Sequence, residues 1–139
     1  MSNLLVPLGI AVLSAQNSQR WQRSGPPHAP RKTPQQLCSL VAVTTAAAFA
    51  IPVGELTANT RRAPYIAFAR QSAMYLAHVS FGLSYTDVGR GFGRDRTTAA
   101  YACRLIEERR DDPAVDGVLG SLEGVCAALR ARLGASVRS

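Results

Sequence analysis

Residues that favour helix starts recur along 33–134 and divide this segment into short helices. Their number and spacing predict an all-α fold. Each of these residues is a Ser, Thr or Asp that suits the N-cap, or a proline that suits the first helical turn. No long stretch alternates with the strand period of two, and aromatic residues make up only 6% of the chain. We therefore expect a small helical bundle, with a disordered leader and linker over 1–32 and a disordered tail over 135–139.

Two long helices are expected in the first half of this segment. The first begins with a capping-box pattern at Thr33 and ends at Pro52. A short turn over 53–58 leads to a second helix that opens at Pro64, with Gly82 just after its C-terminus. The expected buried faces are Leu37, Leu40, Val41, Thr44 and Ala48 in the first helix, and Ala69, Ala73, Leu76 and Ala77 in the second.

A short capped helix, a glycine turn and a second capped helix come next, which is the plan of a helix-turn-helix. The short helix is expected over 84–91, with Phe92 in the core and Gly93 in the turn. The second, the expected recognition helix, runs over about 95–109. Its expected inner face consists of Ala99, Ala102, Cys103 and Ile106.

A last helix is expected to start at Asp112 and Pro113. Gly117, Gly120 and Gly124 each weaken it by roughly 1 kcal/mol relative to alanine. We therefore expect this helix to depend on packing, against this domain or against a partner. Its apolar stripe is Val115, Val118, Leu119, Leu122, Val125, Cys126, Leu129 and Leu133.

The charge distribution points to a polyanionic partner, although a high arginine content by itself also raises the pI. The formal net charge is +7 and the pI is about 10.2. Between Leu56 and Ile106 the only acids are Asp87 and Asp95, against seven arginines. These are Arg61, Arg62, Arg70, Arg90, Arg94, Arg96 and Arg104.

Polar residues gather over 94–98, where the expected recognition helix begins. Arginine pairs with guanine, Asp accepts from cytosine, and a threonine methyl packs on thymine. Backbone N–H groups at a helix start also favour phosphate. Other interpretations stay open: Arg94 and Arg96 form a merely solvated face, and Asp95 is an N-cap, a base contact or both.

Four strings of residues stand in a specific order and spacing over the middle of the chain. They are Arg70-Gln71-x-Ala73-Met74, Val88-Gly89-x-x-Phe92-Gly93, Arg94-Asp95-x-Thr97-Thr98 and Ala102-Cys103-Arg104-x-Ile106-Glu107. Together, over about 37–129, they resemble the C-terminal DNA-binding domain of the bacterial replication initiator DnaA. That resemblance implies a helix in the major groove of a short asymmetric box and an upstream basic loop in the adjacent minor groove.

The resemblance also implies a role for each matched residue. Asp95, Arg96 and Thr97 would read bases, while Arg62, supported by Arg61, would enter an A·T-rich minor groove. The phosphate contacts would be Arg70, Gln71 and Thr98. The whole expected DNA-binding set is Arg61, Arg62, Arg70, Gln71, Thr86, Arg94, Asp95, Arg96, Thr97, Thr98, Tyr101 and Arg104.

The chain departs from the family pattern at several positions. These are Gly93 in place of two glycines, Arg96 and Tyr101 in place of histidines, and Leu105 in place of a basic residue. Arg96 suits either guanine or a phosphate. Arg104 is open to two interpretations, a phosphate contact or an ion pair with Glu107 or Glu108 along the helix.

No catalytic motif accompanies these strings, so we expect a protein that is not an enzyme and holds no cofactor, nucleotide or metal. The only lysine is Lys32, which excludes a G-x-x-x-x-G-K phosphate loop and the initiator's ATPase module. The three cysteines lack metal-ligand spacing, and each falls on an expected apolar face. We expect them to be buried thiols.

These features favour a stand-alone DNA-binding regulator of replication initiation or transcription that occupies initiator-box-like sites. The alternative is an adaptor that keeps the fold, binds DNA weakly and contacts a protein of the replication machinery. The apolar run over 4–13 is too short to span a bilayer, and no Lys or Arg precedes Arg20. We therefore expect a cytoplasmic, nucleoid-associated protein without membrane contact, rather than a secreted one.

Overall fold

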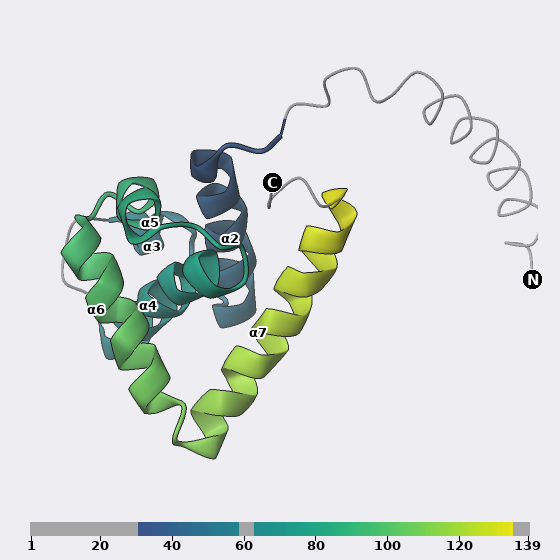
Figure 1. Cartoon of the computed structure of the whole chain (residues 1–139). Coiled ribbons are helices and arrows are strands. Elements are labelled where there is room, and N and C mark those ends of the chain that lie inside the picture. The colour runs from purple at the N-terminus through teal and green to yellow at the C-terminus, as the bar shows by residue number, and fades with distance from the viewer. Residues whose placement is uncertain (1–30, 59–62, 135–139) are drawn as a thin grey trace, which may run out of the picture. The chain divides into compact units, whose positions relative to one another are not determined.

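The computed structural model describes residues 31–58 and 63–134, and within these ranges every regular element is a helix. This confirms the all-α expectation, and the described helices belong to one compact unit that begins at Lys32 (Figure 1). The helices are α2 (Pro34–Phe49), α3 (Gly54–Thr57), α4 (Pro64–Val79), α5 (Tyr85–Gly91), α6 (Arg96–Arg109) and α7 (Pro113–Arg132).

Helix α2 begins where the sequence predicts but ends earlier. The Gln36 N–H donates to Thr33 Oγ1 at 3.1 Å, and the Thr33 N–H donates to Gln36 Oε1 at 2.9 Å. These two bonds complete the predicted capping box. The helix ends at Phe49 rather than at Pro52, because Ala50 adopts a left-handed conformation with φ 57° and its N–H bonds back to the last turn.

The buried face of α2 is turned relative to the predicted one. Leu40 and Thr44 are only half-buried and Ala48 is exposed. The physical reason is that α2 packs against three helices, α4, α5 and α7, and these together determine which of its side chains are buried. The side chains that it buries are Leu37, Cys38, Val41, Ala42, Thr45, Ala46 and Phe49.

A short helix, α3, stands where the sequence predicted only a turn. Its Leu56 is fully buried, so this segment contributes to the core. Arg70 of α4 holds it in place by donating from Nη2 to the Glu55 carbonyl at 3.1 Å and from Nε to the Leu56 carbonyl at 3.2 Å. A helix of four residues shows no periodicity of its own, which explains why the pattern missed it.

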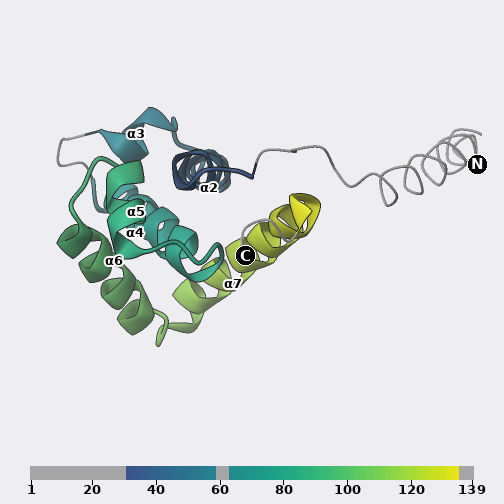
Figure 2. The same cartoon turned by 45° about the horizontal axis from the view of Figure 1, so that its top comes forward.

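Helix α4 is the central element of the fold, since it contacts each of the other described helices. In both Figure 1 and Figure 2 it lies between α6 and α7, which run apart from the corner that they share. The predicted face of α4 is buried, and Ala69, Ala73 and Ala77 are small enough to let its neighbours approach closely. After α4 the chain turns at Gly82, whose φ is 70°.

The cysteines are free thiols on the inner faces of three different helices, as the sequence predicts for buried residues. Cys38 lies on α2, Cys103 on α6 and Cys126 on α7. Burial raises the pKa of each thiol to about 11. At neutral pH these side chains are therefore protonated and act as small apolar residues.

The corner between α6 and α7 is held by Arg110. Its Nε donates to Asp116 Oδ1 at 2.7 Å, and its Nη1 donates to Glu123 Oε2 at 2.8 Å and to the Tyr75 hydroxyl at 3.2 Å. That hydroxyl in turn donates to Glu107 Oε2 at 2.9 Å. Because these charged partners stabilise the guanidinium, the pKa of Arg110 lies above its usual value.

Helix α7 starts at the predicted cap but buries less than the predicted stripe. The Ala114 N–H donates to Asp112 Oδ1 at 2.9 Å. Val118 and Val125, expected in the stripe, are 42% and 46% exposed. The rest of the stripe faces the body: Leu119, Leu122 and Cys126 are buried, and Val115, Leu129 and Leu133 pack against the core while partly exposed.

Removal of a buried core hydroxyl, that of Thr45, is expected to stabilise the protein. Thr45 is fully buried on α2, and its Oγ1 has no hydrogen-bond partner among the described residues. Thr45→Val keeps the shape and removes the unsatisfied polar atom, so we expect the free energy of unfolding to rise by about 1 kcal/mol. Thr44→Val is the matched control, because Thr44 Oγ1 donates to the Leu40 carbonyl at 2.8 Å. Urea titrations of both variants measure the difference, and a less stable Thr45→Val would contradict the assignment.

Candidate nucleic-acid interface

Helices α5 and α6 form the helix-turn-helix that the sequence predicts. The Asp87 N–H donates to the Ser84 hydroxyl at 3.0 Å and starts α5. Phe92 after α5 is fully buried, and Gly93 makes the turn with φ 68°. A side chain at that φ is strained, so glycine is the residue that this turn requires. The Arg94 N–H then donates to the Gly89 carbonyl at 2.7 Å and closes the turn.

The two helices meet at Gly89, where backbone touches backbone. A Cβ built on Gly89 would lie 2.7 Å from the Arg94 carbonyl oxygen and 2.8 Å from the Asp95 carbonyl carbon and oxygen. Those atoms belong to the main chain at the start of α6 and cannot rotate away. The missing side chain of Gly89 therefore allows the close approach that sets the angle between α5 and α6.

Helix α6 begins at the predicted cap and exposes its first turn. Asp95 Oδ1 accepts from the Thr98 N–H at 2.7 Å, which confirms its role as N-cap. This hydrogen bond holds the pKa of the Asp95 carboxyl below its usual value. Asp95, Arg96 and Thr97 are exposed and Thr98 is half-buried. Within the described ranges, the side chains of Arg96 and Thr97 make no hydrogen bond or ion pair.

Arg94 and Arg70, both in the expected DNA-binding set, bond to the protein's own backbone. Arg94 donates from Nη2 to the Ala58 carbonyl at 2.7 Å and from Nη1 to the Phe92 carbonyl at 3.1 Å. Arg70 holds α3 as described above. Together they anchor the chain just before the segment that carries Arg61 and Arg62, and these two residues lie outside the described ranges.

The remaining expected contacts lie on three helices. Gln71 on α4 is half-buried and Thr86 on α5 is exposed. On α6, Tyr101 is 50% exposed, and the guanidinium carbon of Arg104 lies 5.3 Å from the centre of its ring. Of the two interpretations left open for Arg104, the ion pair with Glu107 or Glu108 does not form among the described residues, where the guanidinium lies over the Tyr101 ring.

One basic residue near this surface was absent from the expected set. Arg90 on α5 has a side chain that is 72% exposed, and its Nη1 lies 3.7 Å from Asp87 Oδ1. It follows Thr86 by four residues, so both stand on one face of α5. The first helix of such motifs crosses the DNA backbone. The i, i+4 spacing from Thr86 was the signal that would have identified Arg90 in the sequence.

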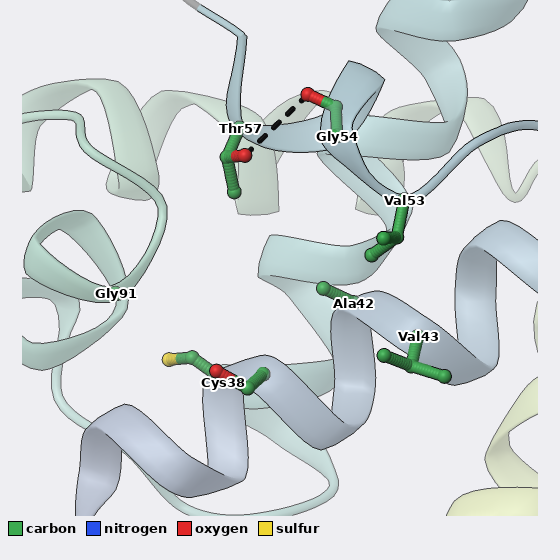
Figure 3. A pocket seen from close by; sticks show the side chains of 8 residues that line it. Cys38, Ala42, Val43, Val53, Gly54, Thr57 and Gly91 are labelled. Carbon is green, nitrogen blue, oxygen red and sulfur yellow. Dashed lines mark hydrogen bonds between the residues drawn. The ribbon is translucent and has the colours of Figure 1, made fainter.

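A pocket of about 290 Å³ lies between α2, α3 and the end of α5 (Figure 3). Its lining is mostly small and apolar, and the Cys38 sulfur points toward Gly91. Because the pKa of the Cys38 thiol is raised to about 11, it is not a nucleophile at neutral pH. The Thr57 hydroxyl donates to the Gly54 carbonyl at 3.4 Å. The pocket thus offers contact surface rather than reactive groups.

Over 31–58 and 63–134, no three His, Cys, Asp or Glu side chains gather where they could hold a metal ion. Nor does any helix in this part of the chain combine the length and apolar character needed to cross a membrane.

Residues 38–106 match the family described as the bacterial dnaA protein helix-turn-helix. This match runs from Cys38 within α2 to Ile106 within α6, so it contains the helix-turn-helix formed by α5 and α6. Residues 38–106 therefore belong to the DnaA helix-turn-helix family. The resemblance drawn from the sequence is confirmed.

Among curated proteins the chain is similar to chromosomal replication initiators of chlamydial bacteria. It is 35% identical over 72 residues to the chromosomal replication initiator protein DnaA 2 of Chlamydia muridarum, which is 52% of this chain and 16% of that protein. Against DnaA 2 of Chlamydia trachomatis the identity is 33% over the same shares. Against DnaA 1 of Protochlamydia amoebophila it is 38% over 66 residues, 48% of this chain and 14% of the relative. The chain thus spans about a sixth of the length of these relatives.

The close approach at Gly89 generates a pair of opposed predictions. Gly89→Ala places a methyl group against rigid main chain, so we expect the free energy of unfolding to fall by about 1–3 kcal/mol. Gly120→Ala on α7 meets nothing within 4 Å and replaces a helix-interior glycine, so we expect a gain of about 0.5–1 kcal/mol. Thermal and urea unfolding of Gly89→Ala and Gly120→Ala measures both changes. Equal changes in the free energy of unfolding would argue against the backbone contact at Gly89.

The Asp95 cap predicts an acid sensitivity at the start of α6. Because its folded-state pKa is lowered, the ionised carboxylate stabilises the native state at any pH above its ordinary pKa of 3.8. That stabilisation is lost as the pH falls through the lowered folded value. We expect Asp95→Asn, which still caps but does not ionise, to abolish this part of the acid dependence. NMR titration of the Thr98 amide measures it, and an Asp95 midpoint above 3.8 would overturn the prediction.

Proposed function

We propose that this protein binds double-stranded DNA at specific sequences, with α6 as the recognition helix in the major groove. The observation that carries the proposal is the exposed first turn of α6, where Arg96 and Thr97 have no side-chain partner among the described residues. Base-reading residues of a helix-turn-helix stand at this place. Arg96 and Thr97 follow the Asp95 cap and make no side-chain bond within the described protein, so they are available to an external ligand.

The chemistry of this turn suits base edges and phosphates. Arg96 has the planar fork that pairs with guanine, and the methyl group of Thr97 suits a thymine methyl. Asp95 Oδ1 accepts from the Thr98 N–H, and because the carboxylate is exposed we propose that it also accepts from cytosine. We propose phosphate contacts from Thr98 and Gln71, and a minor-groove contact from Arg61 and Arg62.

We propose further that this binding regulates replication initiation or transcription without catalysis. Support comes from the family, whose helix-turn-helix is not a catalytic domain, and from relatives named chromosomal replication initiators. A protein that occupies initiator-box-like sites would compete with an initiator for them. It would act in the cytoplasm at the nucleoid and need no nucleotide for binding.

A second candidate is an adaptor that contacts a replication protein and binds DNA weakly. The adaptor candidate is supported by Arg70 and Arg94, whose guanidinium groups donate to backbone carbonyls of the protein itself. These two groups therefore contribute less to phosphate binding than their charge suggests. Such a protein would bind DNA without regard to sequence.

Fluorescence anisotropy with an initiator-box duplex and a scrambled duplex, each at two salt concentrations, tests the proposal. We expect the box to be preferred by at least about ten-fold, or 1.4 kcal/mol. Thr97→Ala should cost about 1–3 kcal/mol on the box only, because it removes a base contact. Ser121→Ala, an exposed change on α7, is the control and should alter neither Kd.

Three outcomes would change this interpretation. Equal and salt-sensitive binding to both duplexes would leave a DNA-binding protein with a different site, to be found by selection from random duplexes. Loss of affinity for both duplexes in Thr97→Ala would remove the base-reading role of that residue. Weak binding that ignores sequence throughout would favour the adaptor.

A further inference from the structure

A stack of two side chains occupies the middle of the outer face of α6. Thr97, Tyr101 and Arg104 follow one another at helical spacings of four and three residues, so they share one stripe. The buried stripe of the helix, which includes Ala102 and Ile106, lies on the opposite side. The Arg104 guanidinium carbon lies 5.3 Å from the Tyr101 ring centre, within the range of a cation–π interaction.

The N–H donors of Arg104 form no hydrogen bond within the described ranges, unlike those of Arg70, Arg94 and Arg110. Arg104 forms no ion pair within these ranges either, and its contact is the ring of Tyr101. The acid one turn further on, Glu107, accepts from the Tyr75 hydroxyl instead. A guanidinium carries five N–H donors, so those of Arg104 are open to an acceptor outside the protein.

The place of Arg104 along α6 suits a phosphate better than a base. It stands seven residues after Thr97, which corresponds to about 10 Å at 1.5 Å per residue. The major groove is about 12 Å wide. When the first turn of α6 reaches the base edges, a residue this far along the helix is near the rim of the groove, where the strand's phosphates lie. Arginine recognises phosphate with two parallel hydrogen bonds.

We propose that Tyr101 is a positioning residue, which holds the Arg104 guanidinium ready for one phosphate at the rim of the major groove. This rests on the proposed DNA-binding function and adds a role for the aromatic ring. An arginine free in solvent loses rotamer freedom when it binds, and a ring beneath it restricts that freedom in advance. The ring thereby raises affinity for every sequence alike, since phosphates carry no sequence information.

A double-mutant cycle on the full chain tests the proposal, again with the box and scrambled duplexes. Arg104→Ala should lower affinity for both duplexes and reduce the slope of log K against log salt by about 0.9, the value of one phosphate. Tyr101→Ala should weaken both by about two- to five-fold, the size of an exposed cation–π contact. Tyr101→Phe keeps the ring and should bind as the unmodified protein does. Tyr101→Ala should have no further effect when Arg104 is already alanine.

The outcomes separate this proposal from a structural role and from the proposed function itself. If Tyr101→Ala and Arg104→Ala act additively, or if Tyr101→Phe loses as much affinity as Tyr101→Ala, the positioning role is overturned while DNA binding stands. Loss confined to the box would mean that Tyr101 touches a base, which also overturns it. If the unmodified protein binds neither duplex, both proposals fail. Thermal unfolding of each variant confirms that the fold is intact.

Discussion

The approach of α5 to the start of α6 at Gly89 is the constraint on which the rest of the site depends. A main-chain hydrogen bond of 2.7 Å from the Arg94 N–H to the Gly89 carbonyl joins the two helices where no Cβ would fit. That junction sets the direction of α6, and packing of its inner face on α4 sets its rotation. The outward direction of Arg96 and Thr97 follows from these two contacts together.

The arginines of this basic chain fall into two groups, those bonded within the protein and those exposed to solvent. Some are bonded within the protein: Arg70 to α3, Arg94 to the chain before residue 59, and Arg110 to two carboxylates and a tyrosine. Others, such as Arg96 and Arg104, direct their charge outward. Net charge therefore indicates a polyanionic partner, but geometry decides which charges are available to it.

Helix α7 lies beyond the residues that match the DnaA helix-turn-helix, yet it shares their core. Leu119 and Leu122 pack on the body, and the Arg110 network joins the end of α6 to α7 through two acids. Since Tyr75 of α4 takes part in that network, the same central helix supports both the helix-turn-helix and the additional helix.

Local sequence signals predict where most helices begin and which residues stand at the first turn of α6. Caps such as Thr33 and Asp95 and the turn at Gly93 act through neighbours within a few positions, so local chemistry suffices to predict them. Three features depend on distant partners and emerge only from the folded structure: which face of α2 is buried, that α3 is a helix, and that Arg94 bonds to backbone carbonyls. Each of these follows from contacts between segments far apart in the chain, and spacing along the sequence does not encode them.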